Sequence, residues 1–384
     1  MRATPRRAIR LLVISAVCST AALPASTVAA RADESSNPTI HPKLFASAPA
    51  GASKPDDITR LGGLLYVTFQ NNAGKDGKPP GSMSTIVAFD RKSGTPVATY
   101  SVTGRCDGLT ADRAHHRVLA SVNEDLHSSL YVITPGDPTP AHYLYSPDPA
   151  ETGSDGTNGG TDAISVSQDG TIYVAHSNPD TALPPPNNTA AVYTMTLSGT
   201  TANLTPFFGV NDPADIVNRT PGGPESAPLG LTDPDSNRFV PGENGGLLIQ
   251  DAQADSKLVF ASNLGSDQPT LSQLNLTNAT PPTGGAATPQ LDDVERVTGP
   301  GTLYAVDQKS GNIYAIDTSG VEPGTFFVSQ PNPSIGDLPN DPALGVVDLE
   351  TGVVTHVDST LGSPKGLLFV PAHRQHDEGE GDEG

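Results

Sequence analysis

Residues 86–102 read IVAFDRKSGTPVATYSV, and this stretch decides the fold class. It opens with a β-branched and aromatic run typical of a strand, and the turn Asp90-Arg91-Lys92-Ser93-Gly94 follows. An Asp that can bond the backbone two residues on, with a Gly free to take positive φ, is typical of a tight hairpin with a bulge. The pattern D-x-[KE]-[ST]-G recurs at 307–311 and 348–352, which indicates a repeated hairpin unit.

Strand pairs of this kind recur along the whole chain. Each first strand is followed by a Pro-, Gly- or Asn-containing loop and a second strand; the first strands are predicted at 65–69, 118–122, 171–175, 258–262, 303–306 and 326–329. Apolar residues are never sustained at the i, i+3, i+4, i+7 spacing, so long helices are not expected. Repeated units of about 40–50 residues without crossover helices predict an all-β fold, a β-propeller with six, possibly seven, blades.

The two ends of the chain have separate predictions. Residues 1–32 have four early arginines, an apolar core at 11–23 and a small-x-small site at 30–32, which predicts a Sec-type secretory signal peptide and a secreted protein. Residues 33–372 are predicted to form a single propeller domain, within which 209–243 is an inserted loop or an extra blade. An outer strand at 39–46 and an inner strand at 366–370 would close the ring in one blade. The acidic tail 373–384 is predicted to be disordered.

Charge and cysteine content narrow the possible partners. Removal of the leader's five arginines from the 22 Lys and Arg residues leaves 17 bases against 42 acids, a net charge of −25. Such a surface repels nucleic acid and anionic lipid, so neither is an expected partner, and the apolar core of the leader is too short for a membrane span. Loss of Cys18 leaves only Cys106, which excludes an intramolecular disulfide. A monomer with an extracellular small-molecule or protein partner is expected.

One polar position recurs before the strands that would line the central channel. It stands two places ahead of an aliphatic residue, and it is occupied by Asp56, Asp107, Asp162, Asp292 and Lys365, with Asn244 one residue further from its aliphatic. These residues would ring one mouth of the channel. Four carboxylates and an amide would repel one another unless a cation lay among them, and Ca²⁺ prefers such oxygen ligands. The predicted metal ligands are therefore Asp56, Asp107, Asp162, Asn244 and Asp292, although an Asp that caps a turn gives the same pattern.

The segment 64–122 resembles a known repeat. Its parts LLYVTFQNNAG, IVAFDRKSGTPVATYSV and CDGLTADRAHHRVLASV are similar to the YVTN-type propeller repeat, which is loosely shared with NHL-type and lactonase-like propellers. In gluconolactonase-like propellers the resemblance implies calcium held by Asn, Asp and Glu within short NG and DG motifs. Asp107-Gly108 and Asn244-Gly245 resemble those motifs, whereas no position matches the family's Glu ligand.

Other candidate residues carry weaker signals. His176 follows a predicted channel strand and is the one candidate for a catalytic base, although an inert strand-edge His is the commoner case. The run Asp233-Pro234-Asp235-Ser236-Asn237 begins like a calcium loop, but Arg238 stands where Gly is required, so a solvated turn is preferred to an EF-hand. The charge of Asp107 beside Cys106 disfavours a nucleophilic thiol.

Two functions follow from these observations. The first is a non-catalytic extracellular platform that binds a ligand or partner at the rim or channel mouth. The second is a calcium-dependent lactonase- or esterase-like hydrolase, in which metal-polarised substrate is attacked by water. No cofactor other than Ca²⁺ is implied, and no motif supports a quinone- or sugar-oxidising propeller.

Overall fold

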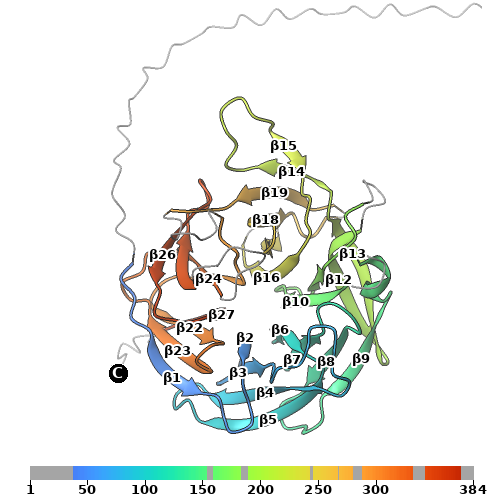
Figure 1. Ribbon diagram of the computed structural model, residues 1–384, viewed down its shortest axis with the longest axis vertical. Helices are drawn as coiled ribbons and strands as arrows, with labels where there is room; N and C mark the ends of the chain where they lie inside the picture. The colour runs from blue at the N-terminus through green and yellow to red at the C-terminus, as the bar shows by residue number, and fades with distance from the viewer. Residues whose placement is uncertain are drawn as a thin grey trace, which may run out of the picture. The chain divides into compact units, whose positions relative to one another are not determined.

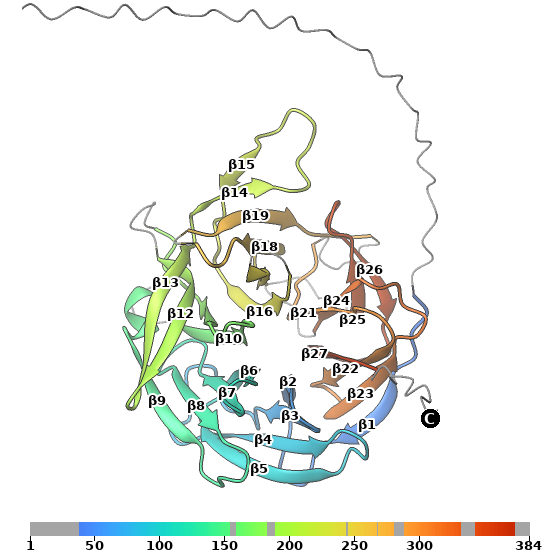
Figure 2. The same ribbon diagram turned by 180° about the vertical axis from the view of Figure 1, so that it is seen from behind.

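The apolar runs of the sequence form strands that are buried on both faces. β3 (Leu64–Phe69) and β7 (Arg117–Val122) are buried along nearly their whole lengths. Such continuous burial arises because each sheet packs face to face against its neighbours around a common centre (Figures 1 and 2). The buried apolar side chains accordingly form clusters between neighbouring groups of strands, for example between β3 and β7.

The computed structural model describes residues 38–153, 159–182, 189–242, 245–266, 268–279, 288–331 and 342–372, all within one compact unit, Asn37–Gly384. Two of its sheets contain consecutive strands only. One has the order β2 (Pro55–Leu61), β3, β4 (Met83–Asp90) and β5 (Pro96–Thr103). The second has eight strands in the order β10 (Gly160–Val166), β11 (Ile172–Ser177), β12 (Ala190–Ser198), β13 (Thr201–Gly209), β9 (Ala141–Ser146), β8 (Ser129–Ile133), β7 and β6 (Cys106–Asp112). A short 3₁₀ helix, η1 (Pro149–Thr152), precedes β10.

The third sheet carries a hairpin on its outer edge. Its order is β15 (Ser226–Pro228), β14 (Pro213–Ile216), β19 (Thr270–Asn275), β18 (Lys257–Ser262), β17 (Leu247–Ala252) and β16 (Pro234–Val240). β14 pairs in parallel with β19, and the β14–β15 hairpin projects from the ring (Figure 1). The segment 209–243 thus contributes both this hairpin and the innermost strand β16.

The last two sheets exchange strands along the chain. One has the order β20 (Thr277–Asn278), β26 (Val353–Asp358), β25 (Ala343–Val347), β24 (Phe326–Gln330) and β21 (Asp293–Arg296). The other has β1 (Lys43–Ser47), β23 (Asn312–Asp317), β22 (Gly301–Asp307) and β27 (Pro364–Pro371). β22 and β23 lie between β21 and β24 in sequence but belong to the neighbouring sheet. Because β1 and β27 share that sheet, the prediction that both ends of the domain close the ring is confirmed.

The predicted division into six or seven equal blades is not what the hydrogen bonding shows. Among the described residues the strands form five sheets of four to eight strands. The difference arises because β13 pairs in parallel with β9 and thereby joins two four-stranded groups into one sheet. The all-β, propeller-like arrangement itself is as predicted.

The repeated turns have the expected chemistry. The Asp90 carboxylate accepts hydrogen bonds from the backbone N–H groups of Lys92, at 3.1 Å, and Ser93, at 2.9 Å, and Gly94 has a φ of +69°. The register of β4 and β5 shifts beside this turn, which is the predicted bulge. The equivalent Gly311 and Gly352 both have a φ of +74°.

Candidate functional site

The carboxylates of the predicted ring lie at irregularities of the innermost strands. The register of β2 against β3 shifts between Pro55 and Ile58, and that of β6 against β7 shifts at Cys106–Gly108. β10 and β16 have similar shifts at 161–164 and 234–237. A bulge leaves a residue outside the ladder and re-aims its side chain. The polar residues at these bulges can therefore face the central axis while the strands remain paired.

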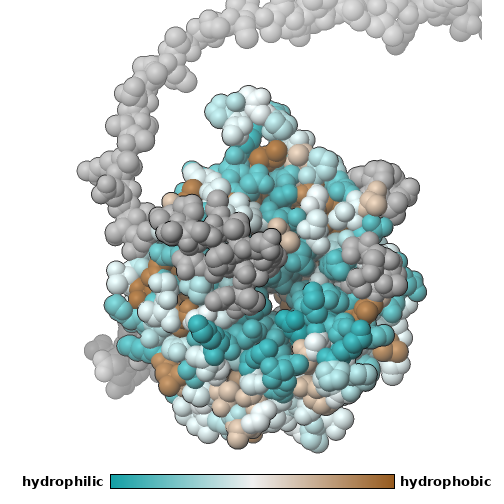
Figure 3. All heavy atoms as spheres, in the orientation of Figure 1, coloured by the Kyte–Doolittle hydropathy of each residue, from teal (hydrophilic) through white to brown (hydrophobic). Residues whose placement is uncertain are grey.

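These side chains meet in a central cavity of about 640 Å³. Ten carboxylates line it: Asp56, Asp57, Asp107, Glu124, Asp125, Asp162, Asp233, Asp235, Asp292 and Asp293. Four cations, Lys75, Arg105, Arg238 and Lys365, line it as well, and no aromatic side chain is among its lining residues. Figure 3 shows hydrophilic residues gathered around the central opening. The cavity is thus strongly polar, with more acids than bases.

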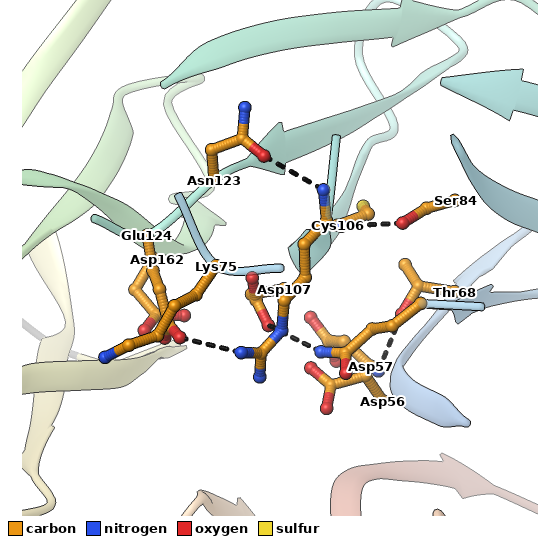
Figure 4. Close-up of polar contacts among 12 residues, drawn as sticks. Asp56, Asp57, Thr68, Lys75, Ser84, Cys106, Asp107, Asn123, Glu124 and Asp162 are labelled. Carbon is orange, nitrogen blue, oxygen red and sulfur yellow. Dashed lines mark hydrogen bonds and ion pairs between the residues drawn. The ribbon is translucent and has the colours of Figure 1, made fainter. Parts of the chain in front are cut away.

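Arg105 connects two of the acids on one side of this cavity. Its Nε lies 3.0 Å from Asp107 Oδ1, and its Nη1 lies 2.9 Å from Glu124 Oε1. Gln70 Nε2 donates a further hydrogen bond of 2.5 Å to Asp107 Oδ1, whereas the buried Oδ2 of Asp107 has no partner among the described residues. Burial raises the pKa of Asp107 against the opposing charge of Arg105. Asp107 therefore presents one unpartnered oxygen to the cavity (Figure 4).

Lys365 connects two acids on the other side. Its ammonium forms a short ion pair with Asp292 and lies 3.5 Å from Asp56 Oδ1. Gln308 Nε2 donates a hydrogen bond of 3.0 Å to the same Asp56 oxygen. Burial raises the pKa of Asp292 to about 7, although the adjacent Lys365 opposes this shift.

A third group of acids lies close together in the cavity. Glu124 and Asp235 both interact electrostatically with Asp162, and Glu124 and Asp162 lie side by side in Figure 4. Burial, followed by the charges of Glu124 and Asp107, raises the pKa of Asp162. Burial also favours the neutral form of Glu124, but Arg105 and Lys75 outweigh it and lower its pKa. Burial likewise raises the pKa of Asp233 to about 6. We call Glu124, Asp162, Asp233 and Asp235 the acid group.

The described residues do not fit the calcium site that the sequence predicts. No three acidic, His or Cys side chains among them lie together as metal ligands. Asp107 is paired with Arg105, and Asp56 and Asp292 are paired with Lys365, so protein cations already balance three of the predicted ligands. Asn244 lies outside the described residues. We therefore assign no chemical step to a metal.

The structure brings together four of the five predicted ligands, Asp56, Asp107, Asp162 and Asp292, as lining of one cavity. The strand that Asn244 would precede is β17, the second strand of its sheet rather than the innermost one. The innermost strand is β16, so the Asp233–Asn237 run is not the solvated turn that the sequence favours. The motif Asn244-Gly245-Gly246-Leu247, which is one residue longer than the others, led the sequence prediction to β17, so β16 was overlooked as the inner strand.

His176 does not line the cavity. It lies in β11, fully buried, with Nδ1 2.8 Å from the carbonyl oxygen of Ala190 and Nε2 3.2 Å from that of Pro149. Burial lowers its pKa to about 4, although both carbonyls oppose this shift. The role as a channel base is wrong, because β11 is one strand removed from the centre. The expectation for Cys106 holds, since burial and then Asp107 raise the pKa of its thiol.

Sequence reasoning missed the cavity residues that come from loops. Glu124 and Asp125 follow β7, and Lys75 lies in the loop between β3 and β4, where its Nζ is 3.1 Å from Asp125 Oδ2. No repeat marks these positions. The only signal was the unusual density of charged residues beside strand ends.

Within the part of the chain that the structure describes, no helix is long and apolar enough to cross a bilayer. No protein-family model matches the sequence, so the YVTN- and NHL-type resemblance stays a prediction. The search of curated proteins found no match either.

Among solved structures, the periplasmic gluconolactonase of Pseudomonas aeruginosa is similar over 82% of this chain and 88% of its own, with 14% identity and a TM-score of 0.47. A putative 6-phosphogluconolactonase from Bacteroides fragilis is similar over 86% of this chain and 98% of its own, with 13% identity and a TM-score of 0.42. Hydrazine synthase of Kuenenia stuttgartiensis covers 78% of this chain and 64% of its own, with 12% identity and a TM-score of 0.41. Likenesses this distant carry no inference about activity.

Proposed function

We propose that this protein is an exported propeller that binds a small cationic ligand, such as an amine, in its central cavity. The observation that carries the proposal is the excess of ten lining carboxylates over four lining cations. Buried like charges raise one another's pKa, and a ligand cation would relieve that repulsion. The lack of aromatic lining disfavours an apolar ligand, which would need hydrophobic surface.

The acid group is the proposed seat of the ligand's ammonium. Asp162 and Asp235 interact electrostatically, and Gln253 Nε2 donates a hydrogen bond of 2.6 Å to Asp235 Oδ2. Asp107, Asn237 and Ser165 also line the cavity, and each has a buried oxygen without a hydrogen-bond partner among the described residues: Asp107 Oδ2, Asn237 Oδ1 and Ser165 Oγ. Carboxylates around an ammonium form charge-assisted hydrogen bonds, which are the strong kind.

The test is calorimetric titration with spermidine, putrescine and glucosamine, with glucose and citrate for comparison. We expect the amines to bind, with affinity that falls as salt rises, and the double variant D162N/D235N to bind at least about tenfold more weakly. The matched control E322Q/E350Q removes two acids from exposed positions and should bind like the wild type. Equal binding of glucose or citrate, or an unchanged D162N/D235N, would refute the proposal.

A hydrolase of lactones or esters is the second candidate, and one observation favours it. The neighbouring residues Glu124 and Asp162 have pKa values shifted in opposite directions, as in acid–base pairs. Glu124 would take a proton from water as it adds to the carbonyl, and Asp162 would give one to the alkoxide as the ester C–O bond breaks. A panel of lactones and esters, with Ca²⁺ or with EDTA, tests this candidate; no turnover under either condition would exclude it.

Export is part of the proposal and has a separate test. N-terminal sequencing of the protein recovered from the culture medium of an expressing bacterium should find a chain that begins near residue 33. A chain that stays in the cell with residues 1–32 attached would contradict export and leave the ligand proposal unaffected.

A further inference from the structure

Lys365 departs from the residue type that the other inner strands place at the channel. The aligned position is Asp56 in β2, Asp107 in β6, Asp162 in β10 and Asp292 just before β21, all acidic. In β27 it is Lys365. One ammonium thus lies among carboxylates whose oxygens are typical ligands of a hard cation.

The contacts of Lys365 are those of an ion enclosed by its counter-ions. Its ammonium touches Asp292 and lies 3.5 Å from Asp56 Oδ1, and the three side chains are 14%, 10% and 7% exposed. Asp235 adds attraction from β16, whereas Arg105 beside β6 opposes it. The ammonium therefore joins acids of two sheets, Asp56 and Asp292. Asp235 in β16 adds a weaker electrostatic attraction.

The backbone beside Lys365 is closely packed. A Cβ at the adjacent Gly366 would lie 2.7 Å from the carbonyl oxygen of Asp56 and 2.8 Å from Asp57 Cα, so β27 packs closely on β2. Leu367 N–H also donates a hydrogen bond of 2.7 Å to Asp293 Oδ2, from the opposite neighbour. β27 is therefore held on both sides, which fixes the backbone from which the Lys365 side chain extends.

We propose that the Lys365 ammonium is a tethered cation that takes the place of a divalent ion between Asp56 and Asp292. The charges of Asp56 and Asp292 are thereby partly balanced by the chain itself, and the stability of this pair does not depend on free calcium. This inference does not rest on the proposed ligand, which would bind at the acid group. It also accounts for the mismatch between the predicted calcium ligands and their observed partners.

The test compares melting temperatures in EDTA and in about 5 mM Ca²⁺, since sites with few carboxylates bind calcium at millimolar levels. The wild type should melt at the same temperature in both. K365M leaves two acids unpaired and should melt about 5–10 °C lower in EDTA, and Ca²⁺ should restore half of this loss or more. The control K75M removes the exposed cavity lysine, which is 58% exposed, and should show neither effect.

A second variant separates lost charge balance from lost packing. K365M/D292N removes the ammonium and its nearer acid and leaves Asp56 with Gln308, so it should regain part of the stability in EDTA and lose the response to Ca²⁺. If K365M does not fold in EDTA, the proposal requires that it refold when Ca²⁺ is added. A wild type that contains stoichiometric calcium, or a K365M that Ca²⁺ does not stabilise, would overturn the proposal.

Discussion

Asp251 in β17 is a single buried acid whose ionisation is opposed by burial and by other acids nearby. Its side chain is fully buried, and its two oxygens have no hydrogen-bond partner among the described residues apart from a weak approach by the N–H of Ala252. Burial raises its pKa well above the ordinary value, and the nearby charges of Asp292 and Asp233 add to the shift. The folded state therefore holds the Asp251 proton to a higher pH than the unfolded chain does.

The raised pKa of Asp251 decides whether the stability of the fold rises or falls with pH. Because the folded pKa lies above the unfolded value of about 3.9, the contribution of Asp251 to stability falls as pH rises above that value. D251N cannot ionise, so it should melt about 3 °C or more above the wild type at pH 7. The difference should vanish below about pH 4, where both states are protonated. Calorimetry across pH measures this; a D251N that melts lower at pH 7 would contradict it, and E350Q serves as the surface control.

Individual site residues were predictable only where a local spacing marked them. The polar residue two places ahead of an aliphatic one identified Asp56, Asp107, Asp162 and Asp292, and for the first three the inner strand begins with the same bulged geometry. Glu124 and Lys75 could not be found in this way. They lie in loops whose paths depend on contacts between sheets, and such contacts leave no periodic trace in the sequence.

At the scale of strands, neighbouring inner strands are joined by a carboxylate and a glycine. Asp57 Oδ2 accepts a hydrogen bond of 2.7 Å from Leu109 N–H of β6, and Asp293 does the same for Leu367 of β27. The second Asp of each D-D pair thus holds the next strand. A Cβ at Gly108 would lie 2.5 Å from the carbonyl oxygen of Asp162 and 2.9 Å from Ala163 Cα in β10.

This close approach predicts a specific sensitivity. G108A and G366A should each destabilise the protein by about 1–3 kcal/mol, because the added methyl group forces two inner strands apart. G320A, which places its methyl in open space, should change stability by no more than about 0.5 kcal/mol. Urea unfolding measures both; equal midpoints for G108A and G320A would show that the strands can move without cost.

Strand pairs were predictable, whereas their assembly into sheets was only partly so. The six predicted hairpin pairs all occur as antiparallel neighbours, for example β3 with β4 and β22 with β23, because turn residues and apolar runs specify them locally. The parallel pairings of β13 with β9 and of β14 with β19 join strands distant in sequence. Nothing in either segment alone encodes such a pairing.

At the scale of the whole molecule, the described strands enclose an acidic centre and use apolar clusters between sheets to hold it. The ring closure by β1 and β27 followed from the sequence, since an outer and an inner strand at opposite ends can complete one sheet. The exchange of β22 and β23 did not follow, because each hairpin fits either of two adjacent sheets by its pattern alone.

That exchange places the completion of both sheets late in the order of strands along the chain. β22 and β23 emerge before β24 but have to wait for β27, while β21 has to wait for β24 across the intervening hairpin. One of these sheets cannot be completed before β26 is present and the other cannot be completed before β27, and β1 lacks its partner β23 until late in the strand order. A chain that folds from its N-terminal side therefore leaves a gap beside its acidic centre until these two strands are in place.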